Sequence, residues 1–235
     1  MAIDRYLAMT GAEIAAGNAL PEKIGYMACH FSPYSTGLSG CPETLPEGAM
    51  LILNDRISPA GHDLRRITAQ LAELTEALGC SSVLLDFERP GCRESAELAS
   101  LLTDALPCPV GVSALYAGDT TGPVFAPPLP CDVPLPEYLE PWAGREIWLE
   151  GALTRQGLLL TNRGAEVAAP LAPDRQIPVH CCEALCCHYQ IRCGDDVHFS
   201  LWRSPEDLLR LEAQAKGLGI RRMVGLWQEL RGIWI

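Results

Sequence analysis

Short apolar runs alternate along the chain with segments whose apolar residues recur at helical spacing. Uninterrupted apolar runs predict strands that are buried on both faces, because such strands have no polar side to expose. Strands are predicted over 24–31, 49–54, 82–87, 110–116, 146–149 and 222–227. Helical spacing predicts helices over 62–78, 94–106 and 204–217, and a short helix over 137–142.

Strands that alternate with helices predict the α/β class, with a parallel sheet surrounded by helices. We expect a compact or incomplete (β/α)8 barrel, because the chain has 235 residues and a full barrel usually takes about 250. A doubly wound open sheet is the alternative. No linker divides the chain, so a single barrel domain is expected over 1–235. Prolines crowd 120–136, which predicts an excursion over one rim, and a hairpin is predicted over 157–171 around Asn162-Arg163-Gly164.

Charge and hydropathy narrow the possible partners. The 29 acidic against 18 basic residues give a formal net charge of -11, which disfavours nucleic-acid binding. The sequence contains no apolar window of about 18 residues, so no membrane span is predicted. The N-terminal residues lack the charged and then apolar pattern of a secretion signal, so the expected location is the cytoplasm. Nothing in the sequence predicts an oligomeric state.

Eleven cysteines are present, five of them between Cys181 and Cys193. A zinc site needs four converging ligands, usually from two spaced pairs. Cys182 and Cys186 have three residues between them, but no second spaced pair is present. Alternate residues of a strand over 186–193 would also face opposite sides. We therefore expect packed, reduced thiols and no metal or organic cofactor. Structural zinc, and a catalytic cysteine with His180 or His188 as its base, remain alternatives.

The segment Ser81-Ser82-Val83-Leu84-Leu85-Asp86-Phe87-Glu88-Arg89-Pro90 carries the main candidate chemistry. A buried strand here ends in Asp86 and Glu88, which lie two residues apart and so point to the same side. In a barrel, the carboxyl ends of strands form the active-site rim. Two acids held together there repel each other, so one tends to keep a proton at neutral pH. The alternative is a pair of ordinary surface acids, with Glu88 paired to Arg56 or Arg89.

The same segment resembles the family 18 glycoside hydrolases, the chitinase-like class, whose fourth strand ends in D-x-x-D-x-D-x-E. Asp86 and Glu88 match the last two acidic positions, whereas Ser81 and Leu84 occupy the first two. The resemblance implies that Glu88 is the acid/base. It implies that Asp86 orients a substrate N-acetyl group, which attacks the anomeric carbon in place of a protein nucleophile.

Weaker matches extend the resemblance along the chain. Residues 24–27 resemble the first strand of such barrels, and 204–227 their last helix and eighth strand. In that family a tryptophan ending this strand floors the sugar site, which Trp227 matches. The sixth-strand M-x-Y-D motif is missing. Ile147-Trp148-Leu149-Glu150 stands roughly in its place, so the resemblance leaves the tyrosine role to Tyr116 or Tyr189.

Three functions follow as hypotheses. The first is a glycosidase that acts on, or at least binds, an N-acetylglucosamine-containing glycan, with Asn54, Asp55 and Glu150 as further rim residues. The second is a barrel that has lost the reaction and binds a sugar or a protein partner. The third is a different barrel enzyme, in which Asn54, Asp55, Glu150 and Glu88 hold a divalent ion. Asp55 serves equally well as a turn cap.

Overall fold

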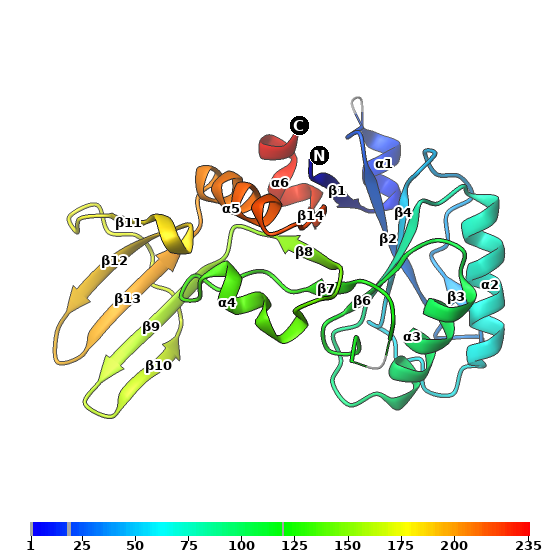
Figure 1. The fold of residues 1–235 in the computed structure, drawn as a ribbon, viewed down its shortest axis with the longest axis horizontal. Coiled ribbons are helices and arrows are strands. Elements are labelled where there is room, and N and C mark those ends of the chain that lie inside the picture. The colour runs from blue at the N-terminus through cyan, green and yellow to red at the C-terminus, as the bar shows by residue number, and fades with distance from the viewer. Residues whose placement is uncertain (1, 18–19, 119) are drawn as a thin grey trace. The chain divides into compact units, whose positions relative to one another are not determined.

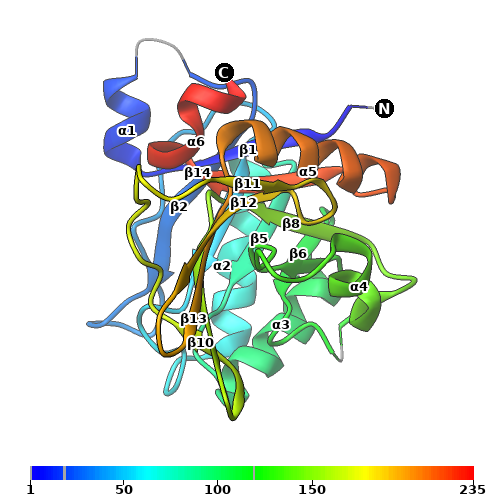
Figure 2. The ribbon, with the colours of Figure 1, turned by 90° about the vertical axis from the view of Figure 1, so that its left-hand side faces the viewer.

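The computed structural model describes residues 2–17, 20–118 and 120–235, and the chain divides into two compact units. The larger unit is the barrel and comprises Asp4–Pro127, Gly144–Glu150 and Arg222–Ile235. The smaller unit is built from Pro128–Ala143 and Gly151–Arg221. Figure 1 labels most helices and strands of both units, and Figure 2 also labels β5.

Eight strands form a closed parallel barrel, because β1 pairs with β14 on one side and with β2 on the other. In order around the barrel the strands are β1 (Asp4–Met9), β2 (Ile24–Phe31), β4 (Met50–Asn54), β5 (Ser82–Asp86), β6 (Val110–Ser113), β7 (Val124–Ala126), β8 (Ile147–Gly151) and β14 (Arg222–Leu226). The predicted (β/α)8 architecture is therefore confirmed.

The helices of the barrel unit are fewer than its strands. They are α1 (Gly11–Ala16), α2 (Leu64–Ala77), α3 (Arg93–Ala105) and α6 (Trp227–Trp234), and a short strand β3 (Leu38–Ser39) pairs antiparallel with β2. Helices α2 and α3 pack side by side (Figure 2). No helix lies between β2 and β4, or between β6 and β7 in the part of that connection that is described, so the barrel is incomplete, as expected.

Alternate side chains of the strands fill the barrel. Trp148 is fully buried at its centre, and this is possible because β6 presents Gly111 to the indole. A Cβ atom at position 111 would lie 2.3 Å from Cε3 of Trp148. The side chains that pack together in the interior are Tyr6, Ala8, Met50, Ile52, Leu84, Phe125, Trp148 and Val224.

The smaller unit is an antiparallel sheet with two helices. Its strands follow the order β10 (Gly164–Ala168), β9 (Arg155–Thr161), β13 (Val197–Trp202), β12 (Cys187–Cys193) and β11 (His180–Cys182). The unit also contains α4 (Leu135–Leu139), α5 (Pro205–Gly217) and the 3-10 turns η1 (Glu140–Trp142) and η2 (Glu183–Leu185). The β9–β10 hairpin confirms the predicted turn, and Ser204 caps α5. None of the described helices is both long and apolar enough to cross a membrane.

Two strands of the barrel, β1 and β7, were not expected, and they change its numbering. β1 precedes 24–31, so that segment is the second strand rather than the first; the charged Asp4 and Arg5 obscure the buried stretch after them. β7 lies within the proline-rich excursion, where three residues between Pro123 and Pro127 are too few for a periodic pattern. Consequently Ile147–Gly151 is the seventh strand and does not occupy the place of the sixth.

Candidate active site

The fourth barrel strand, β5, delivers two carboxylates to the open end of the barrel. Leu84 faces the interior, and Asp86 follows it on the same side, half-buried. Phe87 is buried on the other side, and Glu88 is exposed. Asp86 and Glu88 line one cavity of about 270 Å³ together with Glu150, which ends the inward row of β8. The two predicted catalytic residues, Asp86 and Glu88, thus lie at one cavity with Glu150.

Burial and neighbouring negative charges raise the pKa values of two of these acids, Asp86 and Glu150. Burial, followed by the charges of Glu88 and Asp55, raises the pKa of Asp86 to about 6. Burial, followed by the charges of Asp86, Glu88 and Glu229, raises the pKa of Glu150 to about 7. Glu150 therefore holds its proton over much of the range below neutral pH, and it can donate a hydrogen bond to a ligand in the cavity.

These shifts predict a cost in stability that rises with pH. A carboxyl whose pKa is higher in the folded than in the unfolded chain binds more protons when folded, so stability falls as the pH rises from about 4.5 to about 7. Glu150→Gln should raise the free energy of unfolding by about 2 kcal/mol at about pH 8, and by much less at about pH 5. Urea denaturation at both pH values measures this. The exposed α3 variant Glu97→Gln is the control, and an equal gain at both pH values would contradict the assignment.

The loop after β5 is held by its neighbours. Asp55, 3% exposed at the end of β4, accepts hydrogen bonds from the backbone N–H groups of Glu88 and Arg89, both at 3.0 Å. On the other side, the Tyr116 hydroxyl accepts from the Cys92 N–H at 3.0 Å and donates to the Arg89 carbonyl. Ser113 donates to the Phe87 carbonyl at 2.8 Å. Asp55 and Tyr116 thus position the backbone that carries Glu88.

Asn54 has a comparable role on the adjacent strand. Its Nδ2 donates to the carbonyls of Met27 and Cys29, where the register of β2 shifts, and its Oδ1 accepts from the Arg56 N–H. The side chain lines the cavity but is already bonded through both polar atoms. Among the described residues, Glu88 makes no ion pair with Arg56 or Arg89.

Trp227 and Tyr189 are not among the residues that line the cavity. Strand β14 turns Val224 and Leu226 toward the cavity, so the next residue, Trp227, faces away. Trp227 starts α6 and packs against a cluster of Met9, Ile24 and Ala49. Tyr189 belongs to the smaller unit, where it stacks on His180 with ring centroids 5.1 Å apart.

Sequence reasoning did not single out the apolar residues that line the cavity, and two of them show why. They are Phe125, which lies on the unexpected strand β7, and Leu226, which takes the inward position next to Trp227. Strict alternation along 222–226 was the available signal for Leu226. The sixth strand, β7, has the sequence Val-Phe-Ala and offers no tyrosine.

The cavity does not resemble a cation site. In the described part of the chain, only the smaller unit has three or more His, Cys, Asp or Glu residues whose ligand atoms converge within 4.8 Å. The Asp55 carboxylate is also used by two amides, so the predicted ion site of Asn54, Asp55, Glu88 and Glu150 is not assembled.

No protein-family model matches the chain, and no curated protein sequence does. Solved structures do match. A class V chitinase from Nicotiana tobaccum, crystallised with NAG4, is 10% identical over 98% of each chain, with a TM-score of 0.62. The chain has the fold of the family 18 glycoside hydrolases.

Two further structures agree with this fold. A family 18 N-acetylglucosaminidase from Paenibacillus barengoltzii is 9% identical over 94% of each chain, with a TM-score of 0.59. The spore cortex-lytic enzyme SleL from Bacillus cereus is 12% identical and has a TM-score of 0.54, covering 95% of this chain and 70% of its own. The low identities fit a divergent form of the family 18 fold.

Proposed function

We propose that this family 18-like barrel binds an N-acetylglucosamine-containing glycan in the Asp86–Glu88–Glu150 cavity and hydrolyses it. The observation that carries the proposal is the position of Asp86 and Glu88. They follow the fourth strand of a barrel with this fold, with Asp86 turned inward and Glu88 exposed at the same cavity. The lining also includes Met27, Phe125 and Leu226, and apolar surface of this kind suits the faces of sugar rings.

The proposed reaction has two steps. Glu88 gives its proton to the glycosidic oxygen, and the N-acetyl carbonyl oxygen of the substrate attacks the anomeric carbon as that bond breaks. Asp86 accepts a hydrogen bond from the N-acetyl N–H and stabilises the positive charge that develops on the ring formed. Water then attacks the anomeric carbon, its proton passes to Glu88, and the N-acetyl group is restored. Protonated Glu150 donates to a sugar hydroxyl.

A binding protein without turnover is the second candidate, and two observations favour it. Leu84, 1% exposed in the barrel core, stands where the family motif has an acid that would partner Asp86. No tyrosine extends from β7 toward the cavity. Both features weaken the stabilisation of the charged intermediate, while leaving a cavity that can hold a sugar.

Assaying the parent chain tests the proposal. We expect saturable release of the aryl group from glycosides of N-acetylglucosamine oligomers between about pH 4 and pH 8, with a maximum on the acid side of neutrality because Asp86 and Glu150 titrate near there. Calorimetry with the free oligomers measures binding in parallel. Binding without turnover would support the second candidate, and the absence of both would refute the proposal.

A further inference from the structure

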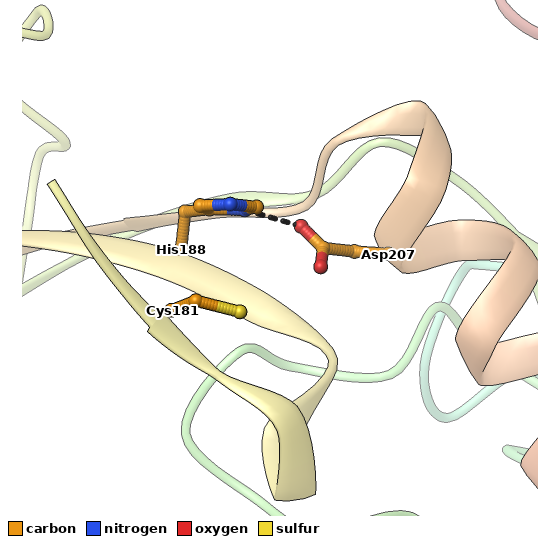
Figure 3. A group of neighbouring side chains, drawn as sticks. All are labelled: Cys181, His188 and Asp207. Atoms are coloured by element: carbon orange, nitrogen blue, oxygen red, sulfur yellow. Dashed lines mark hydrogen bonds and ion pairs between the residues drawn. The ribbon is translucent and has the colours of Figure 1, made fainter.

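A second group of chemistry-bearing side chains lies in the smaller unit, outside the barrel cavity. Cys181 on β11 and His188 on β12 are directly opposite each other in an antiparallel pair, so their side chains share one face of the sheet. Asp207, in the first turn of α5, reaches the same place (Figure 3). Ligand atoms of all three lie within 4.8 Å of one another.

Each member of this group is held by a neighbour. The Asp207 side chain is fully buried, and its Oδ2 accepts from the Ser204 N–H at 3.0 Å and faces His188 Nδ1 at 2.6 Å. Trp202, opposite His188 on β13, stacks on the imidazole at 6.1 Å between centroids. The positions are therefore set by a sheet, a helix start and a stacked ring, which is the kind of rigid support that metal ligands have.

A positive charge already occupies the space between sulfur and carboxylate. One atom, Nη1 of Arg210, donates to the Cys181 Sγ at 3.6 Å and to the Asp207 Oδ1 at 2.9 Å. The Arg210 side chain is 48% exposed, so it can move into solvent without losing a buried position. A small cation that replaces Nη1 would contact the same two atoms.

We propose that Cys181, His188 and Asp207 form a binding site for a borderline-soft divalent cation of the zinc class, with Arg210 occupying the position of the ion in its absence. Sulfur, imidazole nitrogen and carboxylate oxygen are the ligands that zinc prefers. Three protein ligands leave a fourth position for water. The Cys181 thiol gives its proton to solvent and binds the ion as the thiolate, while His188 binds through Nδ1 as the neutral imidazole, with its proton on Nε2. Because Cys181 is exposed, an ion can enter from solvent.

The sequence pattern did not indicate this set. The spacing in the sequence favours Cys182 and Cys186 as ligands, but the sheet places Cys182 and Cys187 in the apolar core of the smaller unit, on the other face. Only the register of β11 against β12 brings Cys181 to His188. The helix that supplies Asp207 starts at Pro205, 17 residues after His188 in the chain.

Titration of the chelator-treated full chain with Co²⁺ or Zn²⁺ alone tests the proposal. We expect one ion per chain by elemental analysis, and a sulfur-to-cobalt charge-transfer band. Cys181→Ser should remove the band, and both Cys181→Ser and His188→Gln should weaken Zn²⁺ binding at least about 100-fold. Arg210→Gln should tighten it roughly tenfold, because a neighbouring positive charge opposes a cation.

Cys193→Ser is the matched control, since Cys193 is an exposed cysteine of the same strand as His188 and lies outside the group. The tested positions are exposed or partly exposed, and thermal unfolding of each variant verifies that it folds. The proposal is overturned if no ion binds stoichiometrically, if Cys193→Ser weakens binding as much as Cys181→Ser, or if Arg210→Gln abolishes it. In those cases the group is an ion-pair network that anchors α5.

Discussion

Glu88→Gln is expected to lower kcat for hydrolysis of N-acetylglucosamine oligomers by about 10²–10⁴-fold, the usual contribution of a general acid. The amide keeps the shape of the carboxyl and cannot transfer a proton to the glycosidic oxygen. Because Glu88 is exposed and its backbone N–H is bound by Asp55, the loop should keep its conformation. KM and the melting temperature should therefore change little. Steady-state kinetics and thermal unfolding measure the three quantities.

A comparison of substrates with different leaving groups distinguishes a general acid from a residue that only shapes the cavity. An aryl group that leaves as a stable phenolate needs little protonation, so the loss in Glu88→Gln should be much smaller with an activated aryl glycoside than with an oligosaccharide. Glu97→Gln, on the exposed face of α3, should match the parent on both substrates. Equal losses on the two substrates would argue against Glu88 as the acid, although the cavity could still bind the glycan.

Trp148→Ala is expected to cost about 3–5 kcal/mol of the free energy of unfolding, because a fully buried indole is removed from the centre of the barrel. The cost should depend on position 111. In the parent, Gly111→Ala should destabilise the barrel by about 1–3 kcal/mol, since the new Cβ would lie 2.3 Å from Trp148 Cε3. After Trp148→Ala the added methyl group enters the vacated space.

A double-mutant cycle measures this dependence. Urea denaturation gives the free energy of unfolding of the parent, the two single variants and the double variant. The double variant should lose about 1–3 kcal/mol less than the sum of the two single losses. Strictly additive losses would mean that Gly111 and Trp148 do not compete for the same space. Trp142→Ala, on a partly exposed turn of the smaller unit, is the control for loss of a tryptophan away from the barrel, and it should cost far less.

The sequence predicted the parts of the fold that have long, regular patterns. Helices α2 and α5 lie within two residues of their predicted ends, because apolar spacing and the caps at Asp63 and Ser204 act locally. Strands β1 and β7 escaped because their patterns are short, and β1 in addition pairs with β14 at the other end of the chain. The remaining strands were enough to predict a barrel, because that prediction needs only buried strands that alternate with helices along the chain.

The candidate site was predictable to the extent that it follows one strand. Asp86 ends β5 and Glu88 follows it by two residues, so their common cavity follows from period-two geometry. The neighbours of that strand could not be ranked from the sequence. Asp55 was an even choice between rim and cap, and only the register of β4 beside β5 brings it to the Glu88 and Arg89 amides. Successive side chains of β14 point to opposite sides, so a shift of one residue decides that Leu226, and not Trp227, faces the cavity.

The Asp55 contacts also determine how freely the rim can evolve. Asp55, Tyr116 and Ser113 all bind main-chain atoms of the loop, and most residue types supply the same N–H and C=O groups. Substitution at position 89 removes only the hydrogen bond from the Arg89 side chain to the Arg56 carbonyl. Positions 89 and 90 are therefore open to variation, provided that position 89 is not proline, while Gly91 is kept for its φ of +74°. A library randomised at these two positions could alter the rim of the cavity while the acid at position 88 keeps its place.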